Sequence, residues 1–386
     1  MIIFLRKLSK VDKLTLVIVG CLVAIGTLAV YEATINTKLH GIHINNLILF
    51  GVFCVPMLIL ATIDYNILVG KLSYVWYGLG IVLLLLVMFK GENINGAVRW
   101  VSIGSFQLQP SEMMKIATVL LAAHLLQKRG GDQLRFVQDI LPLTAVFLLP
   151  TVIIMKQPDL GTALVFIAVM ISMLWMGNVK AMYMIICLSV IAIAVGTICW
   201  LYFVDHDLLA KLVKPHQMSR IQTFLDPTSD PDKSWHVKNA MSAIGTGGLS
   251  GSEGFYMDRG FIPYAYSDSI YVVIGEKYGF LGSSILLLLY FMLIYRIVLI
   301  ANMSMNLAGG YLVIGLVGMI VFQVFVNIGM HIGLVPLTGL SLPFISYGGS
   351  SMLTNMLTIG LVMSVHVHRD SIPLNMTGYK QIMSRS

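Results

Sequence analysis

The stretch 14–34, LTLVIVGCLVAIGTLAVYEAT, is a run of 21 residues with one charged side chain, Glu32. About 20 apolar residues in a helix cross the hydrocarbon core of a bilayer. Similar runs recur along the chain, which is 57% hydrophobic and 11% charged, with a mean hydropathy of +0.85. Soluble domains carry roughly 25% charged residues. We therefore expect an all-α polytopic membrane protein.

Ten such stretches predict about ten transmembrane helices. They lie near residues 14–34, 46–63, 73–89, 111–127, 137–155, 159–177, 179–203, 279–301, 309–331 and 350–366. The whole chain, residues 1–386, is expected to form a single integral-membrane domain. Its one long loop, at about 204–278, would lie between the seventh and eighth helices.

The distribution of Lys and Arg predicts the orientation. Loops on one side of the membrane, together with the two terminal segments, hold 13 of these residues, and the short loops of the other side hold 4. The first set includes Arg369, Lys380 and Arg385 in the C-terminal tail. Because cytoplasmic loops carry the excess of positive charge, both termini are expected to be cytoplasmic and the long loop extracytoplasmic. The protein would then be a multi-pass protein of the cell membrane.

Composition and motifs also exclude several function classes. The net charge of +7 is not gathered into a basic cluster, so nucleic acid is not an expected partner. The four cysteines fall within apolar runs, where they are expected to be buried and unpaired. No phosphate-binding loop, dinucleotide fingerprint or zinc motif is present. Polar, Gly- and Pro-rich sequence instead collects at 92–115, 157–164, 204–278 and 333–351, all on the predicted outer side.

Four of these polar positions, Ser111, Glu112, Lys115 and Asp159, lie at predicted helix starts. Ser111 could cap a helix with Glu112 near its positive end, but Glu112 and Lys115 also share one helix face. An ion pair inside a membrane helix is costly unless it faces a cavity or a partner. Asp159 is either the cap of the sixth helix or a cavity residue, and Lys115 is its expected partner. Both interpretations remain open at this point.

Polar side chains also occur in the ninth helix and in the long loop. Gln323, Asn327 and His331 form one stripe, which indicates either hydrogen bonding between helices or a functional surface. Asp268 is flanked by aromatic residues just before the chain returns to the membrane. Partial burial there would raise the pKa of Asp268 toward the range that suits a general base.

Five segments together resemble the RodA/FtsW/SpoVE, or SEDS, family, with RodA slightly nearer. They occur in the family's order over nearly the whole chain. These segments are NGAVRW (95–100), LQPSEMMK (108–115), QPDLGTAL (157–164), GFIPYAYSDSIYVVIGEKYGFLG (260–282) and NIGMHIGLVPLTGLSLPFISYGGSS (327–351).

The resemblance implies a peptidoglycan glycosyltransferase that polymerises lipid II at the outer leaflet, with a class B penicillin-binding protein as partner. It implies that Asp268 is the catalytic carboxylate. It places Arg99, Glu112, Lys115, Asp159 and Ser346 in the cavity or in the signature segments. Arg99, Lys115 or a divalent cation such as Mg²⁺ would offset the charge of the pyrophosphate.

The sequence departs from the family pattern around Asp268. Tyr264 replaces a Glu, Ser267 replaces a Thr, and Lys277 follows Glu276 where the family carries an acidic pair. Two other functions therefore stay open: a flippase of the lipid-linked precursor, and a non-catalytic scaffold. The process served, whether elongation, division or sporulation, is also left open.

Overall fold

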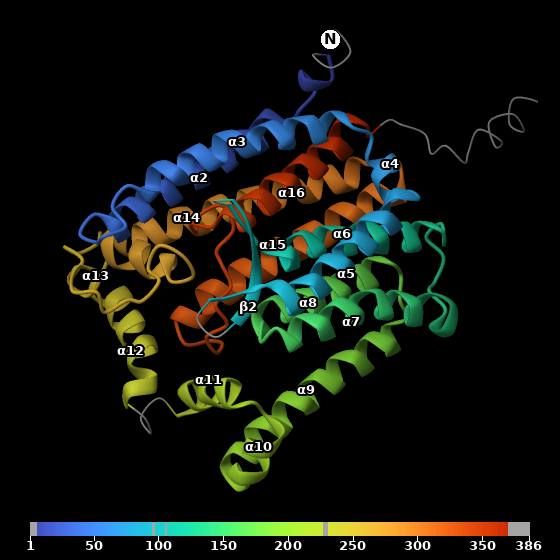
Figure 1. The fold of residues 1–386 in the computed structure, drawn as a ribbon. Coiled ribbons are helices and arrows are strands. Elements are labelled where there is room, and N and C mark those ends of the chain that lie inside the picture. Colours follow the sequence, from blue (N-terminus) through green and yellow to red (C-terminus); the bar gives the residue numbers. More distant parts are fainter. Residues whose placement is uncertain (1–5, 95–96, 105, 227–230, 370–386) are drawn as a thin grey trace, which may run out of the picture.

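The computed structural model describes residues 6–94, 97–104, 106–226 and 231–369, so Lys380, Arg385 and loop residues 227–230 lie outside it. Each of the ten predicted apolar stretches corresponds to one helix (Figure 1). These helices are α2 (Lys13–Thr34), α3 (Ile42–Thr62), α5 (Leu72–Lys90), α6 (Pro110–Gln127), α7 (Leu141–Lys156), α8 (Leu160–Met176), α9 (Ala181–Val204), α14 (Ile270–Met303), α15 (Leu307–His331) and α16 (Gly349–Val367). A short π-helix, η1 (Phe136–Ile140), leads into α7, and α4 (Tyr65–Val69) links α3 to α5.

Within the described residues, eight of these helices are long and apolar enough to cross a membrane; the other two, α6 and α8, are not. Helix α8 is apolar but has only 17 residues. Helix α6 carries Ser111, Glu112 and Lys115 in its first turns. Nearly all of α6 is buried against other helices. Its side chains are therefore shielded from lipid, and polar residues are tolerated there. Length and composition therefore support eight spans where the sequence predicts ten.

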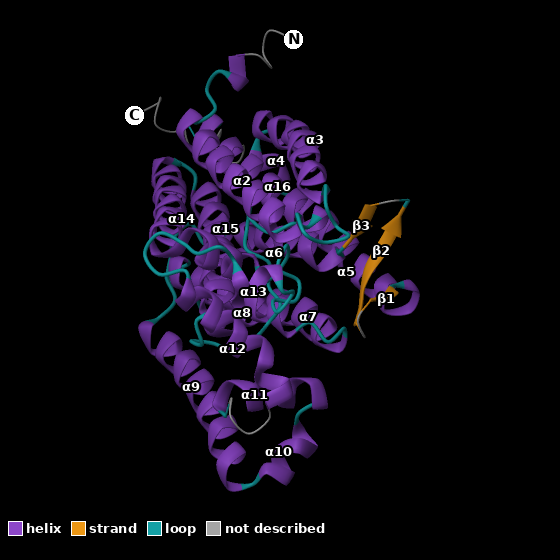
Figure 2. Ribbon diagram, turned by 90° about the vertical axis from the view of Figure 1, so that its left-hand side faces the viewer, coloured by secondary structure: helices purple, strands orange, loops and turns teal. Residues whose placement is uncertain are grey.

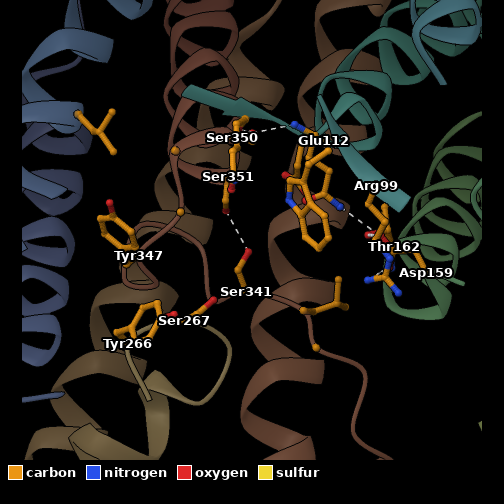
Figure 3. A pocket seen from close by; sticks show the side chains of 18 of the residues that line it. Arg99, Glu112, Asp159, Thr162, Tyr266, Ser267, Ser341, Tyr347, Ser350 and Ser351 are labelled. Carbon is orange, nitrogen blue, oxygen red and sulfur yellow. Dashed lines mark hydrogen bonds and ion pairs between the residues drawn. The ribbon is translucent and has the colours of Figure 1, made fainter. Parts of the chain in front are cut away.

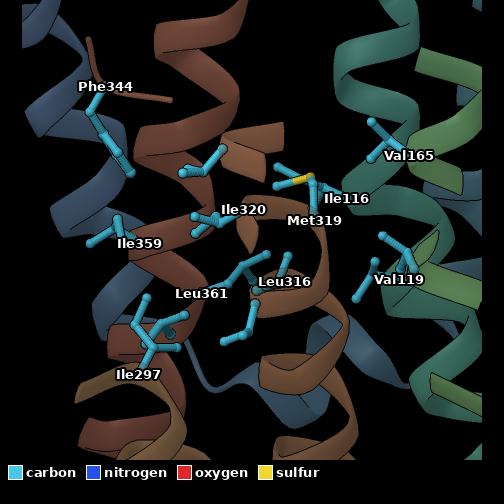
Figure 4. Close-up of a cluster of buried hydrophobic side chains, with 14 of the residues drawn as sticks. Ile116, Val119, Val165, Ile297, Leu316, Met319, Ile320, Phe344, Ile359 and Leu361 are labelled. Carbon is cyan, nitrogen blue, oxygen red and sulfur yellow. The ribbon is translucent and has the colours of Figure 1, made fainter. Parts of the chain in front are cut away.

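The hydrophobic core lies between α6, α8, α14, α15 and α16. Figure 4 shows Ile116 and Val119 of α6 in the same cluster as Leu316 and Ile320 of α15 and Ile359 of α16. In the apolar windows of α15 and α16, 72% of residues are buried, whereas only 11% are buried in that of α9. The central helices thus pack on protein, and α9 presents its apolar side chains outward, as lipid contact requires.

Helix α2 begins and helix α16 ends at the same end of the bundle. Asp12, the N-cap of α2, pairs with Arg296 of α14 through oxygen–nitrogen distances of 2.7 and 2.9 Å. Ser364, near the end of α16, donates a hydrogen bond to the carbonyl of Ile63 just after α3. An even number of chain crossings is consistent with this arrangement. Which end faces the cytoplasm stays a prediction.

A small antiparallel sheet, which the all-helical prediction did not include, follows α5. It comprises β1 (Glu92–Ile94), β2 (Ala97–Ile103) and β3 (Phe106–Leu108), and it lies on one side of the bundle (Figure 2). Glu92 pairs with Trp100, and Val101 pairs with Leu108. The β-branched residues of AVRWVSI favour strand, and the sequence lacks the apolar length of a span.

The long loop folds into four helices and ends earlier than the sequence predicts. They are α10 (His206–Leu212), α11 (Pro215–Leu225), α12 (Pro231–Thr246) and α13 (Phe255–Asp258). The next helix, α14, begins at Ile270, whereas the sequence predicts its start at residue 279. The helix is kinked at Gly279, with φ 60° and ψ −154°. Backbone N–H groups freed after the kink donate to the carbonyls of Gly248 and Leu249.

Candidate active site

The first of two adjoining cavities has a volume of about 710 Å³ and lies at the bundle end opposite the starts of α2 and α5. Figure 3 shows its lining side chains from close by. The cavity is bounded by β2, by the N-terminal ends of α6, α8 and α16, and by residues of α3. Arg99, Glu112 and Asp159 line it. Most of the other polar lining groups are serine hydroxyls and glutamine amides, including Gln109, Ser350 and other residues shown in the figure.

Asp159 and Arg99 pair with each other across this cavity. Arg99 Nη1 lies 3.7 Å from Asp159 Oδ1, and the Arg99 guanidinium also donates to the carbonyls of Gln157 and Pro158. Asp159 is the N-cap of α8, as one of the two interpretations expected, and accepts hydrogen bonds from the N–H and hydroxyl groups of Thr162. Both ions are therefore engaged within the protein.

Glu112 and Lys115 form the predicted pair, with Lys115 Nζ 2.9 Å from Glu112 Oε1. Lys115 is buried and does not line the cavity, so its predicted pairing with Asp159 is wrong. The reason is local: the i,i+3 spacing directs Lys115 to Glu112 on the same helix. The N-cap of α6 is Gln109 with Pro110 following it, so Ser111 is not the cap.

The second cavity, of about 410 Å³, contains Asp268. It is lined by α11, α12, residues 262–269, the end of α15 and residues 333–339. Asp268 Oδ1 is fully buried and has no hydrogen-bond partner. Burial raises the pKa of Asp268 to about 6, against the opposing effects of backbone N–H groups and of the positive charge of Arg220. This carboxyl can therefore exchange a proton near neutral pH.

Residues Thr338–Leu340, which we call the septum, separate the two cavities. Gly339 lines both of them, and a Cβ added at this glycine would lie 3.6 Å from Asp268 Oδ2. Asn327 fixes the septum, because its side-chain amide donates to the carbonyls of Leu340 at 2.7 Å and of Asp268 at 2.8 Å. Asn327, one of the three residues of the polar stripe on α15, thus makes hydrogen bonds from the helix to two loops.

Ser346 lies outside the lining of both cavities. Its hydroxyl donates to the carbonyl of Ser267 at 2.7 Å and accepts from the N–H of Leu342 at 2.8 Å. It therefore joins the segment that carries Asp268 to the segment that follows the septum. Ser350, at the start of α16, joins this helix to β3 and α6 by bonds to the carbonyl of Gln107 and the N–H of Gln109.

Arg220, Gln109 and Ser341 line the cavities without a sequence signal that predicts it. Arg220 lies on α11, an amphipathic helix whose polar residues resemble those of any solvated helix. Only the folding of α11 over the septum brings Arg220 to Asp268. As for Mg²⁺, the described part of the chain has no group of three or more His, Cys, Asp or Glu side chains placed to hold a metal ion.

Comparison with known proteins identifies the family. The model of the FtsW/RodA/SpoVE family, described as "Cell cycle protein", matches residues 10–371. The chain belongs to the SEDS family. Peptidoglycan glycosyltransferase MrdB of Escherichia coli K12 is 33% identical over 328 residues, covering 82% of this chain and 83% of that one.

Solved structures agree with the SEDS assignment. RodA of Thermus thermophilus, a rod shape determining protein, is 27% identical, with a TM-score of 0.69 and coverage of 94% and 98% of the two chains. A chain from a peptidoglycan synthase complex that coordinates polymerization and crosslinking has a TM-score of 0.79 at 29% identity, covering 94% of this chain and 99% of its own. This SEDS protein is thus a multi-pass bacterial membrane protein with a RodA-like fold, and it is a peptidoglycan glycosyltransferase of cell-wall synthesis.

Proposed function

We propose that this SEDS protein polymerises lipid II, with Asp268 as the general base. The observation that carries the proposal is the state of Asp268: a carboxyl oxygen that is buried without a partner, in a cavity, on a group whose pKa is raised to about 6. A general base works best when its pKa lies near the working pH and a substrate hydroxyl can reach it.

The reaction is a displacement at the anomeric carbon of a lipid-linked donor sugar. The 4-hydroxyl of the acceptor sugar forms the new C–O bond, and its proton passes to Asp268. The bond between the anomeric carbon and the diphosphate oxygen breaks, and the polyprenyl diphosphate leaves with the electron pair. Water exclusion around Asp268 strengthens its interaction with the attacking hydroxyl.

The first cavity suits the uncharged polar parts of the substrate. Arg99 and Asp159 already neutralise each other, so what the cavity offers is mainly hydroxyl and amide groups and the indole of Trp100. Such groups match sugar hydroxyls and N-acetyl or peptide amides. Lys115 cannot contact a substrate in this cavity because it lies behind Glu112, and we assign it a structural role.

We propose that both cavities face the extracytoplasmic side. They lie at the bundle end away from Asp12 and Arg296, where the positively charged terminal segments begin and end. The positive-inside rule assigns that charged end to the cytoplasm. Lipid II displayed on the outer leaflet would then reach Asp268 from the membrane. A class B penicillin-binding protein is the proposed partner, by analogy with the peptidoglycan synthase complex that shares this fold.

The test is polymerisation of purified lipid II in proteoliposomes without a transmembrane gradient. We expect Asp268→Asn to lower the rate by at least about a hundredfold, since a positioned base contributes roughly 10²–10⁴-fold. Asp258→Asn is the matched control: Asp258 is an exposed loop aspartate outside both cavities and should retain the wild-type rate.

Two results would contradict the proposal. If Asp268→Asn makes polymer at the wild-type rate, Asp268 is not the base. If the wild-type protein moves labelled lipid II between leaflets and makes no polymer even with a transpeptidase partner present, the flippase function holds instead. Thermal unfolding of each variant, compared with the wild type, separates a loss of chemistry from a loss of fold.

A further inference from the structure

Among the side chains that the structure describes, Arg220 is the only Arg or Lys that lines the second cavity. It extends from α11, whereas Asp268 extends from the segment before α14, so the two charges reach the cavity from different elements. Their charges interact, because the positive charge of Arg220 lowers the pKa of Asp268. A substrate group in this cavity therefore meets one cation and one carboxyl.

The hydrogen bonds of Arg220 leave most of its donors available. Its Nη1 donates to the carbonyl of Thr338 at 3.2 Å, and among the described residues it forms no ion pair. An arginine has five N–H donors in a fixed planar fork. The bond to Thr338 holds the guanidinium against the septum and fixes its direction, and its other donors have no acceptor among the residues that the structure describes.

The other two cations near the cavities are engaged differently. Arg99 has Asp159 and two backbone carbonyls as partners. Lys115 is buried on Glu112. Neither has a comparable number of donors available for an anionic ligand. Arg220 is thus the cation near Asp268 that can accept a new anion without giving up an existing ion pair.

Burial makes an anionic ligand favourable at Arg220. Desolvation and the nearby charge of Arg99 lower the pKa of Arg220, while the negative charges of Asp159 and Asp268 oppose this effect. The arginine remains protonated. A half-buried guanidinium that forms no ion pair among the described residues gains from a further anion, and its planar fork matches two phosphate oxygens at once. Apolar side chains, among them Phe224, Met241 and Val335, also line the cavity near Arg220.

We propose that Arg220 binds the diphosphate of the leaving polyprenyl group in the second cavity. This inference rests on the proposed polymerase function and adds a residue to it. As the anomeric C–O bond breaks, negative charge grows on the diphosphate oxygen, and the Arg220 guanidinium donates to the diphosphate oxygens. Because that charge is greatest in the transition state, Arg220 lowers the barrier as well as holding the ligand.

The first experiment measures binding to the purified full-length protein. The probes are undecaprenyl diphosphate and undecaprenyl monophosphate. The wild type is expected to prefer the diphosphate, and Arg220→Met should lose about 10- to 100-fold in diphosphate affinity, the range for charge-assisted hydrogen bonds. Arg220→Lys keeps the positive charge but lacks the planar set of N–H donors. Its affinity for the diphosphate should lie between those of the wild type and Arg220→Met. Arg259→Met is the control, because Arg259 is exposed and stacks on Phe255 outside both cavities.

The second experiment measures lipid II polymerisation by the same variants. Arg220→Met should lower kcat. A rise in KM with unchanged kcat would instead indicate that Arg220 binds the diphosphate of the acceptor lipid and not that of the leaving group, which would overturn the proposal. Equal diphosphate affinity in wild type and Arg220→Met would also overturn it. If Arg220→Met fails to fold, the Arg220→Lys variant decides by the same two measurements.

These outcomes separate the inference from the function on which it depends. Asp268→Asn should bind undecaprenyl diphosphate as the wild type does, or more tightly, because it removes a nearby negative charge, and yet make no polymer. A wild type that binds the diphosphate but never polymerises lipid II would refute the polymerase function. A wild type that polymerises, with Arg220→Met indistinguishable from it, would refute only the role of Arg220.

Discussion

The two cavities differ in how their charges are satisfied. In the first, Arg99 is paired with Asp159, and Glu112 is paired with Lys115. In the second, Asp268 has an unpartnered buried oxygen, and Arg220 forms no ion pair among the described residues. Paired ions are held by their partners and shape the walls. Unpaired ions remain available to a substrate, and this difference separates the residues expected to affect stability from those expected to affect rate.

The largest effect on stability is expected from breaking the buried pair of α6. Glu112→Ala leaves the Lys115 ammonium, which is 2% exposed, without its counterion. Removing one partner of a buried pair costs about 3–5 kcal/mol. Thermal or denaturant unfolding in detergent would measure this loss.

A double variant tests whether the pairing itself is responsible. Glu112→Gln combined with Lys115→Met removes both charges and should recover most of the lost stability. If the double variant were as unstable as the single one, the cost would come from packing at this position and not from an unpaired charge.

Crowding the septum should affect rate more than stability. Gly339 has φ +74°, and the Cβ of Gly339→Ala would lie 3.6 Å from Asp268 Oδ2. The backbone strain costs about 1–2 kcal/mol, and the methyl group narrows the space beside the proposed base, so we expect polymerisation to fall about tenfold. Gly104→Ala is the control, because Gly104 has φ +63° but no atom near its added Cβ. Equal rates in the two variants would show that the septum does not limit access to Asp268.

The smallest expected effect is the dependence of the rate on pH between 6 and 8, above the steeper fall at lower pH. Asp268 has its pKa raised to about 6, and a base must be deprotonated to accept a proton. The value of kcat/KM should therefore rise with pH through a midpoint near 6 and fall about tenfold for each unit below it. Titration of activity between pH 4.5 and 8 measures this limb. The midpoint should be higher in Arg220→Met, because this variant lacks a positive charge that favours the carboxylate form of Asp268. A midpoint near 4 in the wild type would contradict the burial of the reacting group.

The sequence predicts the parts of this molecule that depend on local rules. A helix lies at each of the ten predicted stretches, eight of them long and apolar enough to span a membrane among the described residues, and the i,i+3 spacing predicted the contact between Glu112 and Lys115. Asp159 was expected to pair with Lys115, but α6 directs Lys115 to its own neighbour while β2 brings Arg99 over Asp159. That sheet has no apolar periodicity long enough to predict its position.

Local sequence patterns do not predict the second cavity. Arg220 and Asp268 are separated by 48 residues; Arg220 lies on the amphipathic loop helix α11, and α12 follows it before Asp268 is reached. Their meeting depends on the septum, which belongs to a third segment of the chain. Asp268 itself was found through its aromatic neighbours and the family motif. Its missing hydrogen-bond partner is visible only in three dimensions.

The septum has a consequence for how the enzyme would tolerate sequence change. At Gly339 the wall between the two cavities is a single peptide backbone without a side chain. Its thickness is therefore set by covalent geometry and by two amide hydrogen bonds from Asn327. Side chains lining either cavity can diverge between relatives without altering the distance between groups bound on the two sides of the septum. Substrate preference and reaction geometry can in this way evolve separately.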